Sequence, residues 1–277
     1  MAEKENEKEV LSLEEASQLF QVSSKTFLKL LREEAIPARK IGREWRFSRT
    51  ALLNWIAQGS SRDYVSVEEE SKAYFAQVAP VYDELRKNCY AGALRDLLTS
   101  QFPPPSGSIV ADVGTGTGYL AKKLAEYAKT VNAIDSSPDM LEVARQGLTQ
   151  PELKKIKLIE GDAHDLPLDD ESQDLVYSNL LIHHLLEPAL AIKEMYRILK
   201  SNGKVIITDI DRHNHKWTKT EKSDLWLGVD RSDLHLWLEQ AGFSEIQISD
   251  LDCNCRVNSA SGIMVEIPMF VATGLKS

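Results

Sequence analysis

The chain has 277 residues and a mass of 31.1 kDa, which is enough for two domains and too long for a single small binding module. Its 43% apolar and 27% charged residues are ordinary for a globular protein, and it has no apolar run of about eighteen residues that would span a bilayer. The first ten residues mix acidic and basic side chains, unlike a secretory or mitochondrial leader. Because the chain also has only three cysteines, we expect a cytoplasmic protein.

Charge is distributed unevenly along the chain. The formal net charge is -9 and the pI is about 5.3, values that for the whole chain argue against a nucleic-acid partner. Residues 22–49, however, contain eight Lys or Arg against three Glu, a net of +5, so the other residues together carry -14. We therefore expect any nucleic-acid partner at the basic front of the chain.

The first sixty residues predict a small helical domain with a wing. Helix starts are marked by capping side chains: Ser12 with Glu15, then Ser23 or Ser24, then Ser48. Pro37 ends the second helix, and β-prone residues around Gly42, within 39–47, predict a short hairpin. The polar stretch 58–63 is typical of a linker. We therefore place a first domain at 1–60, a linker up to about residue 70 and a second domain at 71–277.

Residues 10–56 resemble the MerR-like excisionase helix-turn-helix DNA-binding domain, most closely in GREWRF at 42–47. The resemblance implies a second helix that enters the major groove of duplex DNA and a wing that reaches phosphates or the minor groove. The residues implied are Ser24, Lys25, Thr26 and Lys29 on the helix, and Arg39, Lys40, Arg43 and Arg46 on the wing. One such domain makes few phosphate contacts, so a homodimer on paired half-sites is expected. A solvated basic face, or a helix-turn-helix that contacts only proteins, are the alternatives.

Strand-like apolar runs and helix-period segments alternate from residue 108 to residue 209. Strands are expected at 109–113, 131–134, 156–159, 175–177 and 205–208. A helix at 232–241 and two late strands, near 246–248 and 264–272, follow them. Repeated strand, helix, strand order predicts an α/β fold in which helices cover both faces of a parallel sheet.

Closely spaced glycines follow the first of these strands directly. Gly114, Gly116 and Gly118 lack a Cβ, so the backbone can approach a bound ligand. The spacing differs from the G-x-G-x-x-G fingerprint, and by itself it is compatible with a simple strand-to-helix turn. Asp135 ends the next strand, 21 residues (135 - 114) after the first glycine, where a carboxylate can accept hydrogen bonds from both ribose hydroxyls of a nucleoside. Asp162 ends the third strand, where it can receive an adenine amino group.

Five segments in order resemble the class I S-adenosylmethionine-dependent methyltransferases, in particular the branch with the ubiquinone and menaquinone methyltransferases. They are FAQVAPVYD at 75–83, VADVGTGTG at 110–118, AIDSSPDML at 133–141, EGDAHDLPLDDESQDLVYSN at 160–179 and YRILKSNGKVIITD at 196–209. The resemblance implies a Rossmann-like fold from about residue 73 onward, with S-adenosylmethionine as cofactor. The cofactor-binding residues that it implies are Tyr82, Asp112, Gly114, Thr115, Gly116, Asp135, Ser136, Met140, Asp162, Ala163, Asn179 and Leu180. Among them, Tyr82, Asn179 and Leu180 would close over the sulfonium end.

The sequence does not identify a dedicated catalytic acid or base. Methyl transfer is an in-line displacement in which positioning and desolvation contribute most, so such a residue is not required. His183 and His184, after the fourth strand, are the candidates for a general base that faces the substrate. With His213 and His215 they gather at the sheet edge where ligands bind, but we expect no metal there, and helix-start packing is the plain alternative.

Two features near the C-terminus bear on the substrate. Residues 225–243 resemble methyltransferases fused to ArsR-type transcriptional regulators, but Val229 stands where those carry Phe, so the substrate's identity does not transfer. Cys253 and Cys255 suit a soft metalloid ion such as arsenite, or are ordinary strand residues.

Two functions from different classes remain. In the first, the chain is an enzyme that methylates an unidentified small molecule, and the front domain regulates transcription or locates the enzyme. In the second, it is a transcriptional regulator in which the methyltransferase fold senses S-adenosylmethionine or another effector with little or no catalysis. DNA methylation is a weaker option, because residues 178–181, Ser-Asn-Leu-Leu, replace an Asn/Asp-Pro-Pro-Tyr type motif.

Overall fold

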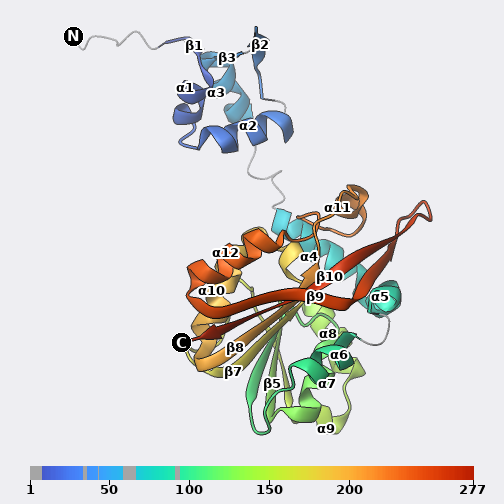
Figure 1. Ribbon diagram of the computed structural model, residues 1–277. Coiled ribbons are helices and arrows are strands. Elements are labelled where there is room, and N and C mark those ends of the chain that lie inside the picture. Colours follow the sequence, from blue (N-terminus) through green and yellow to red (C-terminus); the bar gives the residue numbers. More distant parts are fainter. Residues whose placement is uncertain (1–7, 34–35, 43, 59–66, 91–93) are drawn as a thin grey trace. The chain divides into compact units, whose positions relative to one another are not determined.

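The structure is a computed structural model that describes residues 8–33, 36–42, 44–58, 67–90 and 94–277 (Figure 1). The chain divides into two compact units, residues 1–65 and residues 66–277. Within the described ranges, no helix combines the length and the apolar character needed to cross a membrane.

The first unit packs three helices against a small antiparallel sheet. Its elements are β1 (Val10–Leu11), α1 (Leu13–Leu19), α2 (Ser24–Glu33), β2 (Arg39–Ile41), β3 (Glu44–Ser48) and α3 (Arg49–Gln58). The strand order is β1-β3-β2, so the predicted hairpin is present and gains a third strand. The sequence does not predict β1, because a two-residue strand shows no periodicity.

Side-chain caps start the helices of the first unit as predicted. The capping box at the start of α1 is present. The Thr26 amide donates to Ser23 Oγ at 3.0 Å, and the Ala51 amide donates to Ser48 Oγ at 3.1 Å. These bonds satisfy backbone groups that a helix start leaves unpaired, so short local signals define the helix limits.

An aromatic core holds the first unit together. Phe27 of α2 contacts Phe20 at a ring-centroid distance of 5.5 Å and Phe47 of β3 at 5.2 Å. Ile36 and Leu52 of α3 are buried in the same cluster. Because the apolar side chains are used in this core, Lys25 and Lys29 of α2 and Arg39 and Lys40 of β2 remain on the surface.

The second unit is built around a seven-stranded sheet. Its strands are β4 (Ile109–Val113), β5 (Thr130–Asp135), β6 (Ile156–Glu160), β7 (Gln173–Asn179), β8 (Leu199–Ile210), β9 (Phe243–Asn258) and β10 (Met264–Lys276). Its helical segments are α4 (Val67–Val78), η1 (Ala79–Val81), α5 (Tyr82–Tyr90), α6 (Leu94–Gln101), α7 (Tyr119–Tyr127), α8 (Pro138–Gly147), α9 (Gln150–Leu153), η2 (Ile182–His184), α10 (Pro188–Ile198), α11 (Trp217–Glu221) and α12 (Arg231–Ala241). Every strand expected from the sequence is present.

The strand order of this sheet is β6-β5-β4-β7-β8-β10-β9. Strands β4 to β8 pair in parallel, whereas β10 pairs antiparallel with both β8 and β9. A short hairpin joins β9 to β10, and such a connection makes strands antiparallel. The Rossmann-like fold with helices on both faces is confirmed, with an antiparallel extension after β8.

Helices cover the two faces of the sheet (Figure 1). Leu98 of α6 and Leu124 of α7 are buried in the cluster on one face, and Ile192 of α10 and Leu234 of α12 in the cluster on the other. The chain starts the sheet at β4 and then builds outward on both sides of it. Open α/β sheets have a crevice at the carboxyl ends of the strands where the order reverses in this way.

Candidate functional site

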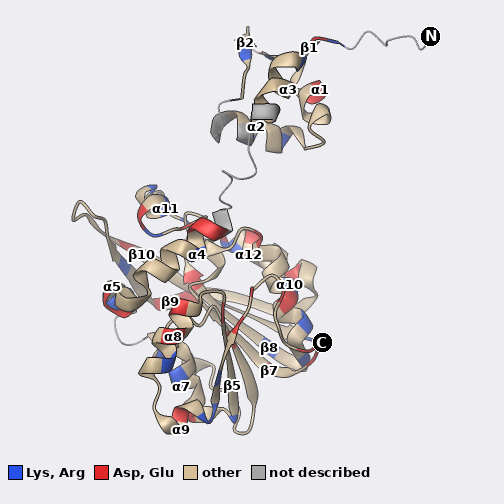
Figure 2. Ribbon diagram, turned by 180° about the vertical axis from the view of Figure 1, so that it is seen from behind, with Lys and Arg blue, Asp and Glu red and all other residues tan. Residues whose placement is uncertain are grey.

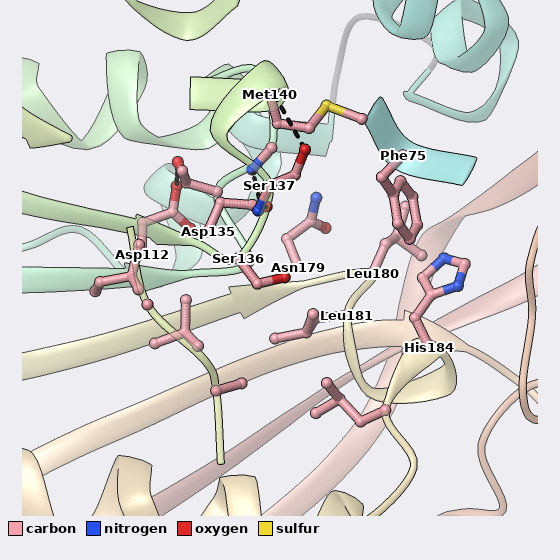
Figure 3. Close-up of a pocket in the computed structure, with 18 of the residues that line it drawn as sticks. Phe75, Asp112, Asp135, Ser136, Ser137, Met140, Asn179, Leu180, Leu181 and His184 are labelled. Carbon is pink, nitrogen blue, oxygen red and sulfur yellow. Dashed lines mark hydrogen bonds between the residues drawn. The ribbon is translucent and has the colours of Figure 1, made fainter. Parts of the chain in front are cut away.

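A cavity with an open volume of about 1110 Å³ is lined by residues that follow β4, β5, β6 and β7. Figure 3 shows Asp112 and Asp135 on one side of it and Phe75 and His184 on the other. We call the first the acidic side, made of Asp112, Asp135, Asp162 and the glycine loop 114–118. The second is the aromatic side, made of Phe75, Tyr82 and His184 with Leu181, Leu185 and Leu186.

The glycine loop turns the chain from β4 into α7. Gly114, Gly116 and Gly118 have φ angles of +74°, +54° and +78°, which side chains rarely allow. A Cβ on Gly114 would lie 2.8 Å from Leu181 Cδ1, whereas one on Gly116 would have only Tyr82 nearby, at 4.0 Å. Gly114 is therefore required for packing and conformation, and Gly116 for conformation. Neither glycine places a Cβ in the cavity that both line.

Asp135, at the end of β5, holds the glycine loop from the neighbouring strand. Its Oδ2 accepts a hydrogen bond from the Gly116 amide at 2.8 Å, and its Oδ1 accepts one from the Ser137 amide at 2.9 Å. Burial raises the pKa of this carboxyl, and the backbone hydrogen bonds act in the opposite direction. A carboxylate oxygen accepts more than one hydrogen bond, so Asp135 keeps capacity for a ligand.

Asp112 and Thr115 line the cavity and support the loop. Thr115 Oγ1 donates to Asp112 Oδ2 at 2.7 Å, and the Thr115 amide donates to the Ile134 carbonyl at 2.9 Å. Asp112 is 1% exposed, and burial raises the pKa of its carboxyl to about 7. Their hydrogen bonds make both residues supports of the loop, and both also line the cavity.

His164 lines the cavity beside Asp162 and Ala163, although the sequence analysis did not single it out. Its amide and its Nδ1 lie 2.9 and 2.8 Å from Asp162 Oδ1. Burial raises the pKa of Asp162, but the hydrogen bonds from His164 outweigh burial, and the pKa is lowered. His164 Nε2 is buried without a hydrogen-bond partner among the described residues. An Asp side chain that accepts a hydrogen bond from the amide two residues later forms a local turn, and this pattern in the sequence could have indicated His164.

Ser136, Met140, Asn179 and Leu180 also line the cavity. Asn179 Oδ1 accepts a hydrogen bond from Thr208 Oγ1 at 2.8 Å. Leu180 has a φ of +55°, which is uncommon for a bulky side chain, and its amide donates to the Thr208 carbonyl at 2.8 Å. The contact with β8 therefore stabilises an unusual backbone turn at the cavity.

The aromatic side is assembled from segments that lie far apart in the sequence. Phe75 of α4 packs edge-to-face on Tyr82, at a ring-centroid distance of 6.2 Å, and on His184, at 5.0 Å. Asp83 Oδ1 accepts a hydrogen bond from Thr117 Oγ1 at 2.5 Å, which joins the start of α5 to the glycine loop. The sequence analysis named Tyr82 but not Phe75, because an aromatic residue on a helix does not indicate which cavity it faces.

The structure separates the two histidines that were candidates for a general base. His184 lines the cavity, but His183 is not among the lining residues and is fully buried, with its Nδ1 2.5 Å from Asp209 Oδ1. Burial lowers the pKa of His184 well below its ordinary value, and His183 and Arg86 lower it further, so this imidazole is neutral at pH 7. His184 Nε2 has no hydrogen-bond partner among the described residues, whereas Nδ1 lies 3.0 Å from the Ser223 carbonyl.

The wider gathering of histidines does not form one site. His213 and His215 stack on each other at 5.3 Å and do not line the cavity. Among the described residues, the group that could hold a metal ion is His183, His184 and Asp224, whose ligand atoms lie within 4.8 Å of one another. Burial opposes a positive charge on His183, but Asp209 and Asp224 outweigh it and raise the pKa of this imidazole, whereas burial, His183 and Arg86 lower the pKa of His184.

Cys253 and Cys255 do not offer a pair of thiolates. Cys253 has a free thiol whose Sγ lies 3.8 Å from Met269 Sδ, and burial raises its pKa. Cys255 is 1% exposed and disulfide-bonded. A raised thiol pKa and the lack of a second thiol both disfavour a metalloid site.

The residues predicted to contact DNA lie on the surface of the first unit. Lys25, Thr26 and Lys29 on α2 and Arg39 and Lys40 on β2 are exposed, while Ser24 and Arg46 are half-buried. Arg39 and Arg46 are direct cross-strand partners, so two cations share one face of the hairpin, although Arg46 is also paired with Glu44. Arg43 lies outside the described residues.

Two family models match the chain. A helix-turn-helix domain matches residues 10–60, and a methyltransferase domain matches residues 111–207. The first range covers the described helices and wing of the first unit, and the second runs from β4 into β8. The methyltransferase match therefore covers the strands and loops that build the acidic side of the cavity.

Curated relatives and solved structures agree with the second match. A chloroplastic 2-methyl-6-phytyl-1,4-hydroquinone methyltransferase of Arabidopsis thaliana is 29% identical over 191 residues, 67% of this chain and 55% of the relative. An uncharacterized methyltransferase of Geobacillus sp. (strain WCH70) is 32% identical over 150 residues, 53% of this chain and 68% of the relative. A possible histamine N-methyltransferase of Thermotoga maritima, described as S-adenosylmethionine-dependent, has a similar fold at a TM-score of 0.54 and 24% identity, with 75% of this chain and all of that chain covered.

The chain spans about half the length of several curated relatives that it matches. The fold and the methyltransferase family model nevertheless agree. The Geobacillus relative, of which two thirds is covered, supports the same family. The chain belongs to the class I S-adenosylmethionine-dependent methyltransferases, whose cofactor is S-adenosylmethionine, and it also carries an N-terminal helix-turn-helix domain.

Proposed function

We propose that residues 71–277 bind S-adenosylmethionine in the cavity and methylate a small molecule, while residues 1–60 bind duplex DNA and regulate transcription. The observation that carries the enzyme assignment is the hydrogen bonding of Asp135, which fixes the glycine loop and still lines the cavity. The name of the Arabidopsis relative, a hydroquinone methyltransferase, supports a small-molecule acceptor. We also propose a cytoplasmic location and a homodimer on DNA.

The acidic side fits the cofactor. Gly114 and Gly116 leave space for its methionine part, because neither residue has a Cβ. Asp135 is placed for the ribose hydroxyls, and Asp162 with its neighbour Ala163 for the adenine. Asp162 Oδ2 accepts no hydrogen bond from the part of the chain that the structure describes, so it has capacity for an amino group. When bound, S-adenosylmethionine supplies an electrophilic methyl group on a sulfonium sulfur.

The aromatic side positions the acceptor and excludes water. Phe75, Tyr82 and the leucine side chains line this part of the cavity, and such an apolar lining lowers the local dielectric. His184 is neutral, and its buried Nε2 has no hydrogen-bond partner among the described residues, so it can accept a proton from a methyl acceptor that comes within hydrogen-bond distance. His183 is a positioning residue, because its contact with Asp209 holds the chain at His184 in place.

A titration of S-adenosylhomocysteine into the full chain tests the binding part of this proposal. We expect saturable binding at one site per chain, weakened about tenfold by Asp162→Ala, because one charge-assisted hydrogen bond is lost. Asp165→Ala removes an exposed carboxylate three residues away and serves as the matched control. No binding to the wild-type chain, or equal loss in both variants, would contradict the cofactor assignment.

The second candidate function is a transcriptional regulator that senses S-adenosylmethionine. The observation in its favour is the helix-turn-helix match over residues 10–60 together with exposed cations on α2 and β2. The test measures fluorescence anisotropy of labelled duplexes at several salt concentrations, with and without S-adenosylmethionine. Arg39→Gln is expected to lower the salt slope by about one unit. Cofactor-dependent operator binding without turnover favours the sensor, and no salt-dependent binding to any duplex contradicts the role in DNA binding.

The narrower family relationships that the sequence motifs suggest also remain proposals. The first unit resembles MerR-like excisionases in its GREWRF wing. The second resembles methyltransferases that are fused to ArsR-type regulators. Both resemblances agree with a protein that combines DNA binding with a methyltransferase domain.

A further inference from the structure

A second cavity, with an open volume of about 660 Å³, lies beside the first. Tyr82 lines both cavities. The second cavity is lined by Tyr74 of α4, Arg86 of α5, Lys222 after α11 and Arg256 of β9. These elements lie near one another in both orientations of the molecule (Figures 1 and 2). None of these four residues belongs to the cofactor site proposed above.

Cations predominate in this second cavity. Arg86 is only 6% exposed, and its guanidinium lies 5.5 Å from the centroid of the Tyr82 ring. Arg86 and Lys222 both line this cavity, so two basic side chains face the same space. Burial and the charge of Arg86 lower the pKa of the Lys222 amine, and Glu221 and Asp224 act in the opposite direction. The acid that lines the cavity, Glu84, is 3.3 Å from Lys87, and therefore has a cation of its own.

Arg256 stands at the cavity from the β9–β10 hairpin. It is paired with Glu266 of β10 at 2.7 Å, which positions its guanidinium. The Tyr74 hydroxyl donates to the Glu221 carbonyl at 3.2 Å, directly before Lys222 in the chain, and so fixes this segment to α4. Asp224, 4% exposed, lies on the histidine side, with its Oδ1 3.6 Å from His183 Nε2. The basic side chains that line the cavity are thus held in place by contacts with neighbouring residues.

We propose that this second cavity is a subsite for an anionic group, a carboxylate or a phosphate, on the methyl acceptor, with Arg86 and Lys222 as its binding residues. The guanidinium fork matches either oxyanion, and the lysine adds a point charge. Tyr82 is 4.0 Å from the position of a Cβ on Gly116 and carries Arg86 on its ring, so the two sites are about one aromatic ring apart. A methyl acceptor about one aromatic ring long can place its nucleophile at the cofactor while Arg86 and Lys222 bind its anionic group. This inference rests on the proposed methyltransferase function.

The test uses the full chain saturated with S-adenosylhomocysteine and two anionic probes, 4-hydroxybenzoate and inorganic phosphate. Titration calorimetry compares 4-hydroxybenzoate with 4-hydroxybenzamide, which has the same ring without the charge. We expect 4-hydroxybenzoate or phosphate to bind to the wild-type chain. If 4-hydroxybenzoate binds, 4-hydroxybenzamide should bind at least about tenfold more weakly. Arg86→Gln and Lys222→Gln should each weaken the anion about tenfold, whereas Lys157→Gln on the exposed face of β6 should not.

The controls separate this inference from the proposed function. Circular dichroism checks folding, and Lys222→Gln keeps the test valid if the buried Arg86 variant does not fold. S-adenosylhomocysteine affinity is measured for each variant and should be unchanged, because neither residue lines the first cavity. If S-adenosylhomocysteine does not bind to the wild-type chain, the proposed function is wrong, and the anionic subsite is then tested by titrating the anions in the absence of S-adenosylhomocysteine. Absence of binding by both anions, or binding that neither substitution weakens, overturns the anionic subsite.

Discussion

The acidic side and the aromatic side of the cavity are built in different ways. On the acidic side, each carboxylate lies at or near the end of a strand of the sheet and is held by nearby hydrogen bonds, as Asp135 is by the amides of Gly116 and Ser137. On the aromatic side, Phe75 and His184 come from segments far apart in the sequence and meet through ring contacts. The first arrangement suits a cofactor common to a family, and the second suits an acceptor that differs between its members. Changes on the acidic side should therefore alter cofactor affinity, and changes on the aromatic side should alter turnover.

The largest expected effect is that of Asp135→Ala. The substitution removes the hydrogen bonds to the ribose and releases the Gly116 and Ser137 amides, so affinity for S-adenosylhomocysteine should fall on the order of 100-fold. Titration calorimetry measures the change. Asp139→Ala, four residues later and exposed, is the matched control and should bind as wild type does. Wild-type affinity in Asp135→Ala would remove the distinction between the two sides.

His184→Gln should act on turnover alone. Loss of a general base typically lowers kcat by about 100-fold or more, while the KM for S-adenosylmethionine should stay within about twofold because the acidic side is intact. His183→Gln instead removes the imidazole that contacts the buried Asp209 carboxylate, so it should lower the melting temperature more than His184→Gln does. Initial rates and thermal melts of both variants measure the two effects. Full activity in His184→Gln would exclude the imidazole as a base.

The sequence predicts the acidic side far better than the aromatic side, for a physical reason. Strand ends that carry a glycine or an aspartate meet at one edge of a parallel sheet, so the position of Asp135 or Asp162 follows from local pattern and strand order. The placement of Phe75 against His184 depends on how α4 packs on the sheet, which local periodicity does not encode. For the same reason the sequence could not show that His184 faces the cavity while His183 does not.

Gly116→Ala tests whether the loop conformation itself supports cofactor binding. A side chain at φ +54° costs about 1 kcal/mol of strain, so affinity for S-adenosylhomocysteine should fall roughly fivefold. Gly262→Ala is matched in strain, with a φ of +83° and open space around its Cβ, but it lies in the β9–β10 hairpin. Thermal melts should therefore show similar losses of stability for the two variants, whereas calorimetry should show lost affinity only for Gly116→Ala. Equal affinities would contradict a role for the loop.

The smallest expected effect concerns Asp112 and pH. Its folded-state pKa of about 7 lies above its ordinary value of 3.8, so the stability that its proton provides is complete below about pH 4 and is lost as the pH rises through 7. Asp112→Asn stays uncharged and still accepts the Thr115 hydroxyl. Its melting temperature should exceed that of wild type by a few degrees at pH 8 and by much less at pH 5. Melts across this range test the prediction, and a difference independent of pH would contradict it.

Transfer of a labelled methyl group tests the central claim most directly. The full chain is incubated with methyl-labelled S-adenosylmethionine and a small-molecule extract, and the label in the small-molecule products is measured after removal of the cofactor. The account predicts labelled products with wild type, strongly reduced label with His184→Gln and none above background with Asp135→Ala. Wild-type protein that binds S-adenosylhomocysteine but transfers no label would contradict methylation of a small molecule and favour the sensor.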